Sequence, residues 1–183
     1  MVRFVLPIAL AALTMLAVLS LDVRLAQVLA DDPADCSKGS GETRVQACSR
    51  IIKSGRLFGK PISKKKLSIA YSNRGVAYRK KGDYDRAIAD YDKAIKLNPK
   101  NASAYNNRAW AYFKWGKAAK GLPDANKAIE LNPKSGTVYG TRGHIYEALD
   151  RKDEAIADFR KALELDLSNE NRREALNRLG VTP

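Results

Sequence analysis

The sequence predicts an all-α protein: a solenoid of three helix-turn-helix repeats, with an N-terminal half-repeat and a C-terminal capping helix. Three segments of nearly the same sequence, at residues 84–100, 123–134 and 153–168, predict the repeats. Aligning the first two on Pro99 and Pro133 gives a period of 34 residues. Each period carries two stretches with apolar side chains at helical spacing, so each unit is a helical hairpin. A composition of 45% hydrophobic and 29% charged residues is typical of one domain with a continuous core.

The first thirty residues predict an export signal. Arg3 gives a positive start, residues 4–21 carry no charge, and Val28-Leu29-Ala30 supplies the small-residue ending that signal peptidase reads. We expect cleavage after Ala30 and secretion across the inner membrane, into a bacterial periplasm. The alternative is an uncleaved, membrane-anchored form, because the uncharged run of 18 residues is just long enough to span a bilayer.

The two cysteines, Cys36 and Cys48, lie just past this signal. In an oxidising compartment an isolated pair predicts a disulfide, with free thiols as the alternative. Redox catalysis would need a closer spacing such as C-x-x-C, and a zinc site would need two more ligands although the single histidine is His144. Around Cys48, residues 42–55 carry apolar side chains at helical spacing, which predicts the second helix of a half-repeat with Cys48 facing the core.

Turn residues separate the predicted helices. In the first unit the helices are expected at about 68–81 and 84–97, with Gly82 at the turn and Asp83 as the cap of the second helix. The predicted parts of the chain are a signal at 1–30, an N-terminal segment at 31–67, repeats at 68–101, 102–135 and 136–168, and a capping helix within 169–183.

Side chains at fixed offsets in each unit resemble the tetratricopeptide repeat family, whose signature is a large residue followed by Gly, Tyr, Gly, Ala, an aromatic residue, Ala and Pro. Unit three matches through Tyr139, Gly143, Tyr146, Ala155, Phe159 and Ala162, but it has Leu167 where the proline is expected, and the array is expected to end there. Unit one matches almost completely, through Tyr71, Gly75, Tyr78, Gly82, Ala87, Tyr91, Ala94 and Pro99.

Unit two departs most from the signature. Ala109 replaces the glycine, Gly121 the alanine and Ala125 the aromatic residue, while Pro123 sits where the second helix should already be running. A proline costs about 3 kcal/mol inside a helix and almost nothing at its first position. We therefore expect this helix to begin near Leu122 or to kink there.

The resemblance implies a right-handed solenoid with a concave groove, lined by the first helices, that holds extended peptides or partner helices. Family members that grip the terminal carboxylate of chaperones use lysine, asparagine and arginine at set positions, and only Asn107 matches here, so that ligand is not expected. Trp110 and Phe113 stand three residues apart, on one helix face, and are expected mid-groove, with packing of Tyr112 and part of Trp110 in the core as the alternative. The implied groove residues are Asn73, Arg79, Asn107, Trp110, Phe113, Lys114 and His144.

One basic and one acidic column recur with the same period. Such columns predict an ion pair between the two helices of each unit, and the alternative is a row of anion-binding arginines. The residues are Arg74, Arg108 and Arg142 on first helices, and Asp90, Asp124 and Asp158 on second helices.

No catalytic constellation is found. Residues 55–61, "GRLFGKP", are one residue short of a phosphate-binding loop, and Pro61 stands where the loop needs a hydroxyl. No nucleophile, base and orienting acid can be assembled around one histidine. We expect neither enzymatic activity nor a cofactor or metal.

The net charge of +13, or +12 without the signal, is not explained by the repeat. Residues 49–81 hold eleven lysines and arginines and no acid, which fits a solvated linker and face, an acidic partner, or an anionic lipid or polymer surface. No base-reading motif supports nucleic acid. The exposed residues expected in this basic patch are Arg50, Lys53, Arg56, Lys60, Lys64, Lys65, Lys66, Lys80 and Lys81.

The sequence thus predicts a non-catalytic, exported adaptor whose groove binds a protein or peptide with acidic flanks. The alternative is a protein of the cell envelope that uses the basic patch to bind anionic lipid or polymer. The effect of groove and lysine substitutions on binding discriminates between them.

Overall fold

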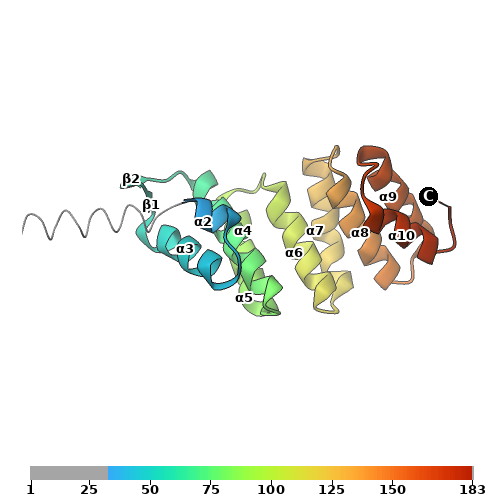
Figure 1. The fold of residues 1–183 in the computed structure, drawn as a ribbon, viewed down its shortest axis with the longest axis horizontal. Coiled ribbons are helices and arrows are strands. Elements are labelled where there is room, and N and C mark those ends of the chain that lie inside the picture. Colours follow the sequence, from blue (N-terminus) through green and yellow to red (C-terminus); the bar gives the residue numbers. More distant parts are fainter. Residues whose placement is uncertain (1–32, 183) are drawn as a thin grey trace, which may run out of the picture.

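The computed structural model describes residues 33–182, and the predicted export signal at 1–30 lies outside this range. Within it, no helix combines the length and apolar composition that crossing a bilayer requires. The predicted all-α solenoid is confirmed (Figure 1). Its helices are α2 (Pro33–Lys38), α3 (Gly41–Ser54), α4 (Lys64–Lys80), α5 (Tyr84–Leu97), α6 (Ala102–Lys114), α7 (Ala118–Leu131), α8 (Gly136–Ala148), α9 (Lys152–Leu165) and α10 (Glu170–Arg178), and its two strands are β1 (Arg56–Leu57) and β2 (Lys60–Pro61).

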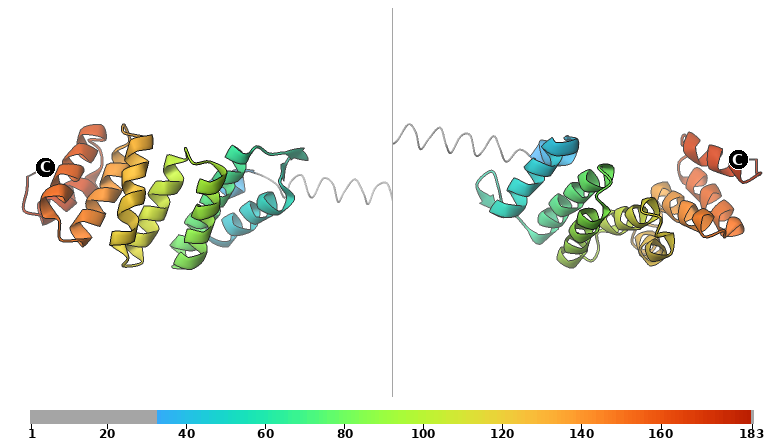
Figure 2. Two further views of the ribbon diagram at one scale, coloured as in Figure 1. Left: turned by 180° about the vertical axis from the view of Figure 1, so that it is seen from behind. Right: turned by 90° about the horizontal axis from the view of Figure 1, so that it is seen from below.

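The helices stack as consecutive hairpins, α4 with α5, α6 with α7 and α8 with α9, between α2–α3 at one end and α10 at the other. Seen from below, they form an arc whose ends, α2 and α10, rise on the same side (Figure 2). The first helix of each hairpin lies on the inner side of this arc. The inner faces of α4, α6 and α8 therefore form the concave surface.

Each hairpin turn uses one residue with a left-handed backbone. Gly82, Gly116 and Asp150 are spaced by the 34-residue period and have φ angles of 79°, 73° and 59°. Glycine adopts this conformation without strain, and aspartate tolerates it better than most residues. Asp83 follows the first of these turns, and its side chain accepts a hydrogen bond from the Arg86 amide, so the predicted helix cap is confirmed.

Small residues on first helices allow an aromatic ring to lie between the two helices of a hairpin. A Cβ added at Gly75 would come within 2.7 Å of the Tyr91 ring, and one at Gly143 within 2.8 Å of the Phe159 ring. Tyr91 and Phe159 are both fully buried. The glycine and the aromatic residue of each signature are thus one packing unit, shared between two helices.

The middle hairpin has small residues in place of both the glycine and the aromatic ring of this packing. Ala109 and Ala125 are both small and fully buried. A Cβ at Gly121 would lie 2.7 Å from the carbonyl oxygen of Ala109, so α6 and α7 are nearly in backbone contact there. Ile145 of the next hairpin joins the same cluster and helps to fill the space that an aromatic ring takes elsewhere.

The expected helix start near Leu122 is wrong, because α7 begins at Ala118 and continues through Pro123. Pro123 is exposed, so the only hydrogen bond it removes, to the carbonyl of Ala119 one turn back, lies on the solvent side of the helix. On the opposite side, Gly121 and Ala125 pack closely against neighbouring helices. The packing of these two residues, one before and one after the proline in sequence, therefore outweighs the preference of proline for a helix start.

Replacing Pro123 by alanine is expected to stabilise the protein by about 1–2 kcal/mol. Alanine restores the amide N–H that can donate to the Ala119 carbonyl, and it removes the ring from the helix interior. The greater freedom of the unfolded chain offsets part of this gain. The free energy of unfolding in urea measures the effect, with Lys120→Ala as an exposed control in the same helix. A Pro123→Ala protein no more stable than wild type would mean that α7 is interrupted at residue 123 in solution.

The N-terminal segment contains the expected helix and two elements that were not expected. Helix α3 matches the predicted 42–55, Cys48 is buried, and the predicted disulfide is present, joining Cys48 to Cys36 on the short helix α2. A two-residue hairpin then pairs β1 with β2, and its turn residues Phe58 and Gly59 both have positive φ. Such turns are usually marked by Asn-Gly or Asp-Gly, so "LFGK" carried only half of the signal.

Helix α4 begins at Lys64 and not near residue 68. Ser63 caps it, its side chain accepting a hydrogen bond from the Lys66 amide. The three consecutive lysines predicted to precede the first hairpin therefore form the first turn of its first helix.

Candidate functional site

A cavity of about 250 Å³ lies between α6, α8 and α10. Helices α6 and α8 are neighbours along the inner side of the arc, and α10 closes its end (Figure 2). The position of the cavity makes it part of the concave surface. Its lining consists of Asn106, Asn107, Trp110, Thr137, Gly140, Thr141, His144, Asn169, Asn171 and Arg172.

Aromatic rings form one wall of this cavity. The ring of Trp110 lies 5.4 Å from that of His144, which contacts the buried ring of Phe159 edge-on at 4.9 Å. Phe113 lies 4.9 Å from Trp110, but it packs on the core side against Ala109 and its neighbours and does not line the cavity. Trp110 and His144 are therefore the aromatic residues that a bound molecule could touch in this cavity.

Burial disfavours the charged form of the His144 imidazole. Burial lowers its pKa below the usual value, against the opposing effect of Glu147, whose carboxylate lies 3.5 Å away. Glu147 in turn accepts two hydrogen bonds from Arg178, which lower its pKa. Lys114 lies at the edge of the aromatic wall, with its Nζ 5.8 Å from the Trp110 ring.

The remaining predicted groove residues are separated from this cavity. Asn73 lines a second, apolar cavity of about 230 Å³ between α4 and the N-terminal segment, with Ile69 and Lys66. Arg79 lies beside the buried phenol of Tyr91, whose pKa burial raises to about 12. The concave surface thus has a polar cavity toward α10 and an apolar one toward α2.

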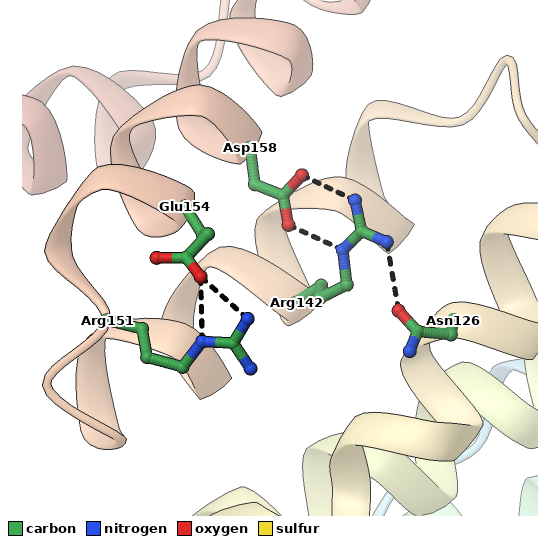
Figure 3. Close-up of polar contacts among 5 residues, drawn as sticks. All are labelled: Asn126, Arg142, Arg151, Glu154 and Asp158. Atoms are coloured by element: carbon green, nitrogen blue, oxygen red, sulfur yellow. Dashed lines mark hydrogen bonds and ion pairs between the residues drawn. The ribbon is translucent and has the colours of Figure 1, made fainter.

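The predicted ion pairs between helices are all present. In each hairpin one arginine of the first helix donates two hydrogen bonds to one aspartate of the second, and Figure 3 shows the pair Arg142–Asp158. These hydrogen bonds raise the pKa of each guanidinium, although burial opposes them. Because the carboxylates are buried and occupied, the columns form a structural ladder and not a row of anion sites. The pairs are Arg74–Asp90, Arg108–Asp124 and Arg142–Asp158.

Each arginine of the ladder also contacts the preceding hairpin. Arg142 donates to Asn126 at 2.9 Å, Arg108 to Asp92, and Arg74 to Ser49 of α3 at 2.9 Å. These contacts were not predicted, because the acceptors share a position but not a residue type. The Ser49 contact also shows that α3 takes the place of a second helix before the first hairpin.

The basic patch is divided in the structure. Its nine residues are exposed, but Lys80 and Lys81 lie at the far end of α4, roughly 25 Å from Lys64 at 1.5 Å per residue. Lys81 also forms an ion pair with Glu42. The basic residues that stay close together lie at the other end of α4, around the hairpin of β1 and β2. They are Lys53, Arg56, Lys60, Lys64, Lys65 and Lys66.

Sequence reasoning missed the contribution of α10 to the concave surface. Asn169, Asn171 and Arg172 come from the predicted capping helix, which was given no binding role. One signal was present, since Arg172 continues the 34-residue column of Ala70, Ala104 and Val138. An arginine in a column of buried apolar residues indicates that this position does more than pack, and it is therefore a candidate binding residue.

Comparison with known proteins identifies the repeats. Sequence models of the tetratricopeptide repeat match residues 68–101, 90–122 and 136–169. No curated protein sequence matched the chain.

Among solved structures, the Arabidopsis OM64 TPR domain is 35% identical, with 64% of this chain and 97% of that one covered and a TM-score of 0.61. The first TPR of Spaghetti (RPAP3), bound to the HSP90 peptide SRMEEVD, is 32% identical, with 64% and 94% covered and a TM-score of 0.62. The second TPR domain of human RPAP3, in complex with the HSP70 peptide SGPTIEEVD, is 30% identical, with 64% and 98% covered and a TM-score of 0.61. The 34-residue hairpins, the glycine–aromatic packing and these matches together place the chain in the tetratricopeptide repeat family.

Proposed function

We propose that this protein is an exported, non-catalytic adaptor that binds a peptide segment of a partner protein in its concave groove. The observation that carries the proposal is the wall formed by Trp110 and His144 beside the amides of Asn106 and Asn107. A half-buried tryptophan next to polar groups that can pair with a peptide backbone is typical of binding hot spots. The solved relatives with bound peptides support the choice of ligand class.

Export is part of the proposal because two features of the chain favour it. The uncharged run at residues 4–21 precedes a small-residue ending. The disulfide between Cys36 and Cys48 is the kind of bond that persists in an oxidising compartment.

Replacing Trp110 by alanine is expected to weaken peptide binding by roughly thirtyfold, equal to about 2 kcal/mol, because the side chain is an anchor in the groove. The probes are peptides enriched by the purified protein from a displayed library of random dodecapeptides with free C-termini. Their dissociation constants are measured by fluorescence anisotropy, and thermal stability is measured alongside. Lys114→Ala, at the rim, should change the salt dependence more than the affinity.

The matched control is Lys64→Ala/Lys65→Ala in the basic patch, which should bind these peptides at full strength. The opposite outcome, full binding by Trp110→Ala and loss with the lysine variant, would move the site to the basic patch and favour the envelope-surface function. A Trp110→Ala protein that unfolds would assign the side chain to the core.

A further inference from the structure

Arg172 is buried without an adequate partner. Its side chain is 9% exposed, and its nearest carboxylate among the described residues, that of Asp166, is 3.9 Å away and itself 45% exposed. Its buried Nε has no hydrogen-bond acceptor within the part of the chain that the structure describes. Each arginine of the ladder, by contrast, donates two hydrogen bonds to one buried carboxylate. Burying a guanidinium on these terms is costly, so a purely structural role does not account for it.

The repeat pattern shows that packing at this position does not require a charge. The equivalent positions in the three hairpins hold Ala70, Ala104 and Val138, all buried. Its guanidinium lies over Gly140, where an added Cβ would come within 3.0 Å of Nε. The corresponding residues of the other two hairpins are Ser72 and Asn106, so the glycine in the third hairpin provides the space for this side chain.

The guanidinium lines the polar cavity together with uncharged donors and acceptors. Asn106 of α6 also has a buried atom, Oδ1, that no group within residues 33–182 contacts by a hydrogen bond and that can accept one. Among the ten lining residues Arg172 is the one permanent cation, since burial lowers the pKa of His144 and favours its neutral form. A single cation with a fork of donors matches a monoanion such as a carboxylate better than a phosphate dianion.

We infer that this cavity binds a carboxylate of the partner peptide, held by the guanidinium of Arg172, with an amide N–H of the peptide donating to Asn106. The inference rests on the proposed function and specifies its ligand. The same chemistry is offered by the last residue of a chain and by a Glu or Asp side chain. An apolar side chain next to the carboxylate would contact Trp110. This site differs from the carboxylate grip of some family members, whose residues this chain does not match, since its cation comes from α10, after the three hairpins.

The test is a titration of the purified, ¹⁵N-labelled protein with small probes, followed by NMR on the Arg172 Nε–Hε and Trp110 indole signals. N-acetyl-leucine presents a terminal carboxylate, N-acetyl-glutamate α-amide a side-chain carboxylate, and N-acetyl-leucine amide no charge. At least one of the two carboxylates should shift both signals, and which one does so identifies the source. The neutral amide should bind roughly tenfold more weakly or not at all.

Arg172→Met should abolish carboxylate binding and raise the melting temperature, because it places an apolar side chain in an apolar column. Arg172→Lys should retain weak binding, since it keeps the charge without the fork. The matched control is Arg173→Met, which removes an equal charge from the same helix outside the cavity and should bind like wild type.

Three results would overturn the inference: carboxylate binding that survives Arg172→Met, tighter binding of inorganic phosphate than of either carboxylate, or no shift with any probe. Peptides selected from the library separate this inference from the proposed function. Peptide binding that depends on Trp110 but not on Arg172 would leave the groove in place and remove the carboxylate site. Probe binding at Arg172 without any peptide binding would keep the carboxylate site and contradict the proposed peptide-binding function.

Discussion

Asp124→Ala is expected to destabilise the protein by about 3 kcal/mol, the largest effect expected of a single substitution here. Asp124 is buried and accepts two hydrogen bonds from Arg108, at 2.6 and 2.7 Å. Removing it leaves a largely buried guanidinium without its main partner, and breaking a buried pair from one side typically costs 3–5 kcal/mol. The lower end applies because the Arg108 side chain keeps 20% exposure and can reach water. Urea denaturation monitored by circular dichroism measures the change.

A second aspartate that pairs with Arg108 provides the control. Asp92 also pairs with Arg108, but its side chain is 54% exposed. Asp92→Ala should therefore cost no more than about 1 kcal/mol, as exposed pairs do. Arg108→Met/Asp124→Leu, which removes both charges, should recover much of the stability that Asp124→Ala loses. Equal losses for Asp92→Ala and Asp124→Ala would show that solvent reaches the Arg108–Asp124 pair as freely as the surface pair.

Reducing the disulfide is expected to cost about 3 kcal/mol, because it closes a loop of 12 residues and restricts the unfolded chain. Helix α2 has only six residues, too few to be stable without tertiary contacts, so its docking on α3 should be lost first. The change in unfolding free energy on adding a reducing agent measures the total effect. Hydrogen exchange of residues 34–54 should show where the structure opens.

Cys36→Ala/Cys48→Ala is the control, since its stability should be lower in buffer and unaffected by the reducing agent. Cys48 also packs against Ala47, Ile51 and Ala70, so part of the loss in this variant comes from packing. Two thiols that react with an alkylating agent in the native, unreduced protein would contradict the bond itself.

The hairpins could be predicted from the sequence because each structural constraint recurs with the period. A glycine facing an aromatic ring, as at Gly75 and Tyr91, leaves two columns at fixed offsets. The pairing of Arg142 with Asp158 was predicted in the same way, from one basic and one acidic column. A repeated column reports a contact made several times, which makes it far more informative than a single motif.

Elements that occur once gave weaker signals. The helix start near Leu122 was predicted from the local preference of Pro123. The packing of Gly121 against Ala109, which lets α7 begin earlier, depends on the distance between two helices and leaves no local signal. The turn at Phe58 lacks the residues usual for its backbone shape. Arg172 could be placed on a helix, but its lack of a close partner becomes visible only when the neighbouring helices are in position.

The contacts that each ladder arginine makes with the preceding hairpin have a consequence for how the array unfolds. In repeat proteins, the stability of a unit is the sum of its own folding energy and the coupling to its neighbours. Here Arg108 and Arg142 place part of that coupling in polar bonds between hairpins, beside the apolar contacts. Separating two hairpins therefore removes an acceptor from a half-buried cation as well as exposing apolar surface. Each of these bonds adds modestly to the coupling that the apolar contacts supply, and coupling of both kinds makes partly unfolded arrays rarer, so the chain should pass between its folded and unfolded states in one concerted step and not unravel hairpin by hairpin.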